Sequence, residues 1–247
     1  MLEHLPYCGA PPAPAELLGR FNLDPILIVA LLALGALHYA TTARQGTGRY
    51  ALLGWLVAAA AFLSPLCALS VSLFAARVGQ HMLLLLVAAP LIALALPRPA
   101  VRHEARGLWV SAAVFFVALW FWHMPVPYDA TFSSTPLYWA MHVTLFGSGI
   151  LLWRALLRHS RERTGDVLAA GALSSMQMGL LGAVLTLAGH PMFVRHFATA
   201  GAWGLTPLQD QQIGGLLMWV PGILFFLWAA LRSLSRLWTL LDEARPA

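Results

Sequence analysis

Four histidines are the residues of this sequence best suited to bind a metal. Each lies on a different apolar segment, and all four lie towards the same side of the predicted bundle. An ionisable side chain inside a membrane-spanning segment is costly, so it indicates a functional site unless a partner satisfies it. His142 is the deepest of the four, about two helical turns into its segment. We expect a metal to be held by these four ligands: His81, His123, His142 and His190.

Methionine accompanies these histidines along the chain. The combination of imidazole nitrogen and thioether sulfur suits copper, and thioether favours Cu(I), whereas calcium or magnesium would call for oxygen ligands. We therefore predict copper as the bound metal. Met192 lies two residues from His190, and the residues predicted to support the site are Met82, Met124, Met141, Asp129, Asp210, Gln211 and Met218.

Two other functions use the same residues. A b-type haem could take two histidines from facing helices as axial ligands, for example His81 and His142. A copper permease would need a polar route continuing towards the inner face, and few polar residues lie in that half of the segments. A hydrolase is disfavoured because we recognise no nucleophile, base and orienting group at a spacing typical of a catalytic triad. We therefore expect a protein that is not an enzyme.

The composition places these residues in a membrane protein. Of 247 residues, 60% are hydrophobic and only 10% are charged, whereas a soluble domain carries roughly 25% charged residues. The 15 basic residues are all arginine. The absence of lysine excludes a retinal or pyridoxal Schiff base and the lysine of a phosphate-binding loop.

Apolar runs long enough to cross a bilayer set the predicted architecture. A span needs about 20 mostly apolar residues. We predict an all-α bundle of seven transmembrane helices, with residues 1–24 as an extracytoplasmic tail, 25–241 as one membrane domain and 242–247 as a cytoplasmic tail. The segments are about 25–42, 50–69, 78–97, 107–123, 136–157, 167–190 and 207–231.

The arginines predict the orientation, because cytoplasmic loops are enriched in basic residues. Arg20, Arg77 and Arg195 lie on one side of the predicted bundle, and the other twelve lie opposite. This split places the N-terminus outside and the C-terminus in the cytoplasm of a bacterial plasma membrane. It also accounts for the basic charge without nucleic-acid binding. The twelve are Arg44, Arg49, Arg98, Arg102, Arg106, Arg154, Arg158, Arg161, Arg163, Arg232, Arg236 and Arg245.

Cys8 and Cys67 are the two cysteines of the chain. They are too few for a disulfide scaffold or a zinc finger. One bridge, two free thiols and soft metal ligands are all compatible with the sequence.

Three motifs carry a resemblance to a known family. They are QHMLLLLVAAPLIALALP from Gln80, WHMPVPYD from Trp122 and GLTPLQDQQIGGLLMWVPG from Gly204. Together with the histidine-bearing start of the fifth segment, they resemble the CtaG-like family of cytochrome c oxidase assembly factors of the caa3 type, over roughly residues 25–235.

The resemblance implies a role in assembling a haem-copper oxidase, with the lipid bilayer and a nascent oxidase subunit as partners. It implies that copper reaches the oxidase from the outer side. The positions that match the family pattern are His81, His123, Asp129, His142, Asp210 and Gln211. One position departs from it, because Arg77 stands where the family often has a second histidine. A cation there repels a metal ion unless it is paired.

Overall fold

The computed structural model describes residues 5–97, 104–159 and 163–243, and within these ranges the regular elements are all helices. The predicted tails are therefore described only in part. Four of the arginines that predicted the orientation lie outside these ranges: Arg98, Arg102, Arg161 and Arg245.

The helices follow one another with short connections. They are η1 (Pro14–Gly19), α1 (Pro25–Ala43), α2 (Gly48–Leu63), α3 (Leu66–Ser72), α4 (Phe74–Met82), the π-helix η2 (Leu83–Ala88), α5 (Ala89–Ala95), α6 (Glu104–Trp122), α7 (Pro125–Ser133), α8 (Thr135–Leu157), α9 (Thr164–Leu187), η5 (Val194–His196), η6 (Ala200–Trp203) and α10 (Pro207–Glu243).

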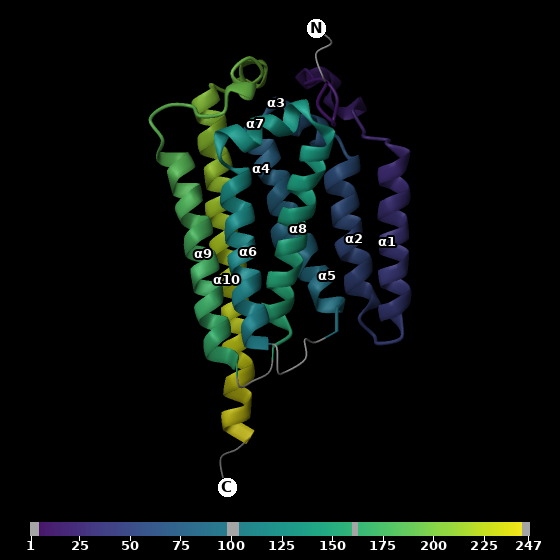
Figure 1. Ribbon diagram of the computed structural model, residues 1–247, viewed down its shortest axis with the longest axis vertical. Helices are drawn as coiled ribbons and strands as arrows, with labels where there is room; N and C mark the ends of the chain where they lie inside the picture. Colours follow the sequence, from purple (N-terminus) through teal and green to yellow (C-terminus); the bar gives the residue numbers. More distant parts are fainter. Residues whose placement is uncertain (1–4, 98–103, 160–162, 244–247) are drawn as a thin grey trace.

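The long helices run side by side, with α1 at one edge of the bundle and α9 at the other (Figure 1). Helix α10 packs along α9 and α4, and α1 packs on α2. The short helices α3 and α7 lie at one end of the bundle, and the last turns of α10 project beyond the opposite end (Figure 1). We call the end that carries α3 and α7 the η1 end, since η1 lies there too.

Six helices of the described chain are long and apolar enough to cross a membrane. Helices α2 and α3 pass the same test only as a pair, bent by 48° between Leu63 and Leu66. Counting that pair as one span gives up to seven. The structure thus confirms a helical protein of membrane type, while the number seven and the orientation of the termini stay predictions.

The segment from Phe74 to Ala95 is the central one, because 72% of its apolar window is buried, against 11% for α1. It is divided into α4, η2 and α5, where the sequence predicted one transmembrane helix over about 78–97. A π-helical turn is rare and often occurs at functional sites. Its Leu85 carbonyl accepts a hydrogen bond from Trp153 Nε1 at 2.6 Å, which anchors η2 to α8.

The described N-terminal segment contacts the bundle at a few positions, although many of its residues are exposed. Tyr7 stacks on the ring of Tyr138 with 4.8 Å between centroids. Cys8 forms a disulfide bond with Cys67 of α3. These contacts fasten the segment across the η1 end of the molecule.

Candidate metal centre

Three of the four predicted histidine ligands meet between α4, α6 and α8. His81 lies on α4, His142 lies on α8, and His123 directly follows the last residue of α6. The ring centroid of His81 is 5.4 Å from that of His123 and 5.2 Å from that of His142, edge to face in both cases. His81 is therefore the central ring, and we call the three the histidine cluster.

The histidine cluster is buried and poor in hydrogen bonds. The exposed fractions of His81, His123 and His142 are 1%, 2% and 2%. Both ring nitrogens of His81 lack a hydrogen-bond partner, as do Nε2 of His123 and Nε2 of His142. A buried polar group without a partner costs about 1–3 kcal/mol. Four such nitrogens on three rings in contact therefore make the cluster a candidate ligand site.

Two backbone carbonyls orient the outer rings of the cluster. His123 Nδ1 lies 2.7 Å from Leu119 O, and His142 Nδ1 lies 2.9 Å from Tyr138 O. A carbonyl oxygen only accepts, so each Nδ1 carries the proton and donates it. In the neutral imidazole the other nitrogen, Nε2, then keeps a free lone pair, which is the form that binds a metal.

Aromatic side chains pack against the His142 ring. The rings of Tyr138 and Phe62 lie 4.2 and 5.1 Å from the His142 ring, centroid to centroid. A cavity of about 420 Å³ between α1, α2 and α8 reaches His142 past Phe62 and Trp139. This cavity gives the cluster a side approach from the α1 edge of the bundle.

His190 and the methionines are placed differently. His190 is exposed in the turn after α9, so the structure does not bring it to the other three histidines. Met124 is 49% exposed. The remaining predicted thioethers are buried in the main apolar core: Met82, Met141 and Met218.

Asp210 has a structural partner instead of facing the cluster. Its two carboxylate oxygens accept hydrogen bonds from Phe74 N at 2.7 Å and Ala75 N at 2.9 Å, the first two amides of α4. A carboxylate at a helix N-terminus satisfies free N–H groups and suits the helix dipole. Asp210 of α10 therefore caps the helix that carries His81.

The other polar residues of the family motifs also hold elements together. Gln211 Oε1 accepts a hydrogen bond from Met192 N at 2.7 Å, and Gln211 Nε2 donates to Leu185 O at 3.1 Å. Asp129 forms an exposed ion pair with Arg195, with Nη2 3.2 Å from Oδ2. Gln211 and Asp129 were predicted to support a metal. The structure shows that they instead make contacts with the segment that connects α9 and α10.

Arg77 is buried one turn before His81, yet its charge is held by other groups. Its guanidinium lies over the Phe132 ring, 4.1 Å from the centroid. Nη1 donates to Thr131 Oγ1 at 2.9 Å, and Nε donates to Ser70 O at 3.3 Å. These contacts with neutral groups fix the cation against α7, but they leave its positive charge one turn from His81.

The disulfide and Tyr138 are features of the site that the sequence left undecided. Cys8 Sγ and Cys67 Sγ lie 3.4 and 3.8 Å from the Tyr138 hydroxyl. The Tyr138 ring packs on His142 in turn. Of the alternatives for the cysteines, the structure shows the bridge, and it places the bridge above the cluster.

The side chains as they stand do not form a closed metal site: within the described residues, no three His, Cys, Asp or Glu groups are already placed to hold one ion. His81 instead contacts both other rings edge to face, and binding one ion would require the rings to reorient.

The fold and the cluster define a class: an all-helical protein of membrane type, with three buried imidazoles gathered at one end of its central helices. The model of the cytochrome c oxidase caa3 assembly factor family matches residues 28–239. The chain belongs to that family. No curated protein and no solved structure matches the chain.

Proposed function

We propose that this protein is a non-enzymatic assembly factor that holds copper in the histidine cluster and passes it to a nascent subunit of a haem-copper oxidase. The observation that carries this proposal is His81, a fully buried imidazole with two unbonded nitrogens between two further imidazoles. The family supplies the connection with the oxidase. The ligand type supplies the connection with copper.

Copper is cargo in this proposal, so it must be able to leave. Imidazole nitrogens from three separate helical segments can release the ion one at a time, as donors on the receiving subunit replace them. No electron is transferred in such an exchange. The cavity that reaches His142 provides the lateral opening, and buried Met82 and Met141 provide soft sulfur close by in sequence.

Orientation is part of the same proposal. The disulfide lies at the η1 end together with the cluster. Disulfides persist in oxidising compartments, and the arginine-rich loops are opposite in the predicted topology. Both arguments support a position of the cluster near the extracytoplasmic face of a bacterial plasma membrane.

The test is copper binding by the purified protein and four variants. We expect one Cu(I) per chain, competed from a chromogenic chelator under anaerobic conditions. His81→Ala, His123→Ala and His142→Ala should each weaken binding by at least about tenfold, because each removes a donor. His190→Ala is the matched control, since this exposed histidine lies outside the cluster, and its affinity should equal that of the wild type.

Two results would contradict the proposal. Unchanged copper affinity in all three cluster variants would show that the metal binds elsewhere. Sharp haem absorption bands in the purified protein, lost in His81→Ala and His142→Ala, would show a b-type haem protein. The third imidazole packed against this pair favours a bare ion over a porphyrin.

A further inference from the structure

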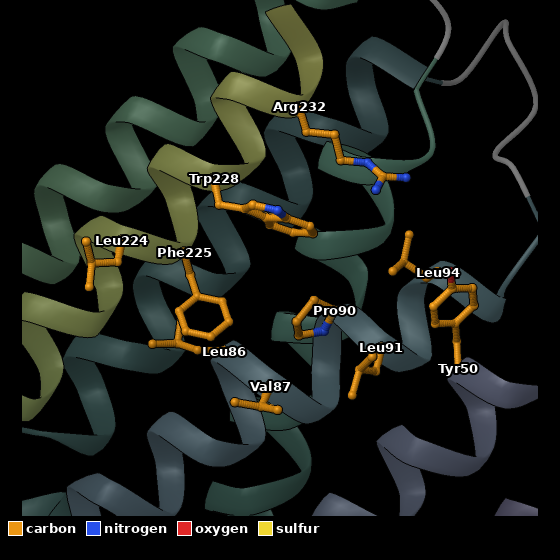
Figure 2. Close-up of a pocket in the computed structure, with 10 residues that line it drawn as sticks. All are labelled: Tyr50, Leu86, Val87, Pro90, Leu91, Leu94, Leu224, Phe225, Trp228 and Arg232. Atoms are coloured by element: carbon orange, nitrogen blue, oxygen red, sulfur yellow. The ribbon is translucent and has the colours of Figure 1, made fainter. Parts of the chain in front are cut away.

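A second pocket lies between α10 and the central segments η2 and α5, and none of the three histidines of the cluster lines it. Its volume is about 560 Å³, and most of its lining is apolar. Figure 2 shows Val87, Pro90 and Leu91 on one side of the pocket and Phe225 and Trp228 of α10 on the other. From Leu86 to Leu94 the lining helix advances about 12 Å, a length suited to part of an acyl chain.

One end of this pocket is basic. The Arg232 side chain extends from α10 towards Leu94 and Tyr50 (Figure 2). Its Nε is buried without a hydrogen-bond partner, and its guanidinium lies 5.7 Å from the centroid of the Trp228 ring. Arg49 adds a second guanidinium, which donates to the Tyr50 hydroxyl at 3.0 Å.

The depth of Arg232 matches the headgroup layer of a membrane. Arg232 lies 25 residues after Pro207, which is about 38 Å along a helix. A bilayer with its headgroups is about 40–45 Å thick. Since α10 begins at the η1 end, Arg232 reaches the opposite headgroup layer, which the arginine distribution predicts to be cytoplasmic.

We propose that this pocket is a binding site for an anionic phospholipid, with an acyl chain against the apolar walls and the phosphate on Arg232. A guanidinium forms charge-assisted, often bidentate hydrogen bonds to phosphate oxygens. Among the described residues that line the pocket there is no carboxylate to pair with the ammonium of a zwitterionic lipid. The site therefore selects a headgroup with net negative charge.

The experiment measures lipid binding to the delipidated full-length protein by native mass spectrometry. Phosphatidylglycerol should bind in preference to phosphatidylcholine. Arg232→Gln should weaken phosphatidylglycerol binding by at least about fivefold, the equivalent of one basic group near the membrane surface. Arg163→Gln is the matched control, because Arg163 is paired with Asp166 and does not line the pocket.

A groove-filling variant separates the acyl chain from the headgroup. Leu91→Trp should reduce phosphatidylglycerol binding while Arg232 remains, and its thermal unfolding should confirm that it folds. Equal binding of both lipids, or wild-type affinity in Arg232→Gln, would overturn the proposal. Displacement of the lipid by millimolar inorganic phosphate would show a free-anion site and would overturn it as well.

Discussion

His81 and His196 show that burial alone does not mark a ligand. Both rings are 1% exposed. His196 Nε2 lies 2.7 Å from the Tyr128 hydroxyl, so this ring has a partner within the protein. His81 has none. Nδ1 of His196 is unbonded too, as is Nε2 of His123 and of His142. At the scale of single residues, His81 is therefore distinguished by having both nitrogens unbonded and by its contact with two further imidazoles.

His196 predicts a pH dependence of stability. Burial, with a smaller contribution from the positive charge of Arg77, lowers the pKa of His196 from 6.5 to about 3. The folded pKa lies below the unfolded one, so the stabilisation is complete above about pH 6.5 and is lost as the pH falls towards 3. Each pH unit in this window costs about 1.4 kcal/mol.

The variant His196→Gln keeps a hydrogen-bonding partner for Tyr128 but does not titrate. The difference in unfolding free energy between pH 7.5 and pH 5.5 should be smaller in this variant by about 1.4 kcal/mol. Thermal unfolding in detergent measures it. The other buried histidines titrate in both proteins and cancel in the comparison, so an identical pH dependence would contradict the assignment.

At the scale of elements, α10 positions α4. Asp210 caps α4, and Gly214 of α10 leaves room for the Phe74 ring: a Cβ at Gly214 would lie 2.6 Å from Phe74 Cδ1. Gly215 allows the same close approach to α9, where a Cβ would meet Gly182 O at 2.6 Å. The most specific family motif therefore builds the helix contacts that hold His81 in place.

Asp210→Ala should destabilise the protein by about 2 kcal/mol or more, because two buried amides of α4 lose a charged acceptor. It should also weaken copper binding through displacement of His81. Asp129→Ala is the matched control, since Asp129 is 37% exposed in its ion pair with Arg195. An exposed pair contributes at most about 1 kcal/mol. Equal melting temperatures for the two variants would refute the capping role.

At the scale of the whole molecule, the two ends differ chemically. The η1 end carries the histidine cluster and the disulfide, and the opposite end carries the pocket lined by Arg232. A copper carrier that serves an oxidase from outside needs this polarity. A lipid site at the other end would anchor the same bundle in the inner leaflet.

This polarity predicts the behaviour of reporter fusions. A fluorescent protein that matures only in the cytoplasm should fluoresce when fused to the C-terminus, and alkaline phosphatase, which needs an oxidising compartment, should be inactive there. The same phosphatase fused to the N-terminus behind a secretion signal should be active. The opposite pattern would place the histidine cluster inside and exclude the proposed route of copper.

Local sequence was enough to predict the class of the protein, its long apolar helices and its family. A hydrophobic run of about 20 residues predicts a membrane-spanning helix from its own composition, whatever the neighbouring segments are. The same reasoning placed His81, His123 and His142 at corresponding depths. The same reasoning wrongly grouped His190 with them, because a hydrophobic segment indicates how deep a residue lies in the membrane but not which way its side chain points.

Only the tertiary structure decided which of these side chains meet. Successive residues on a helix point about 100° apart, so the rotation of each helix against its neighbours determines whether a ring faces another ring, the core or lipid. That rotation comes from contacts between distant segments, such as Asp210 with the start of α4 and Cys8 with Cys67. The sequence therefore identified the residues that could bind a metal, whereas packing between helices determined which of them lie close together.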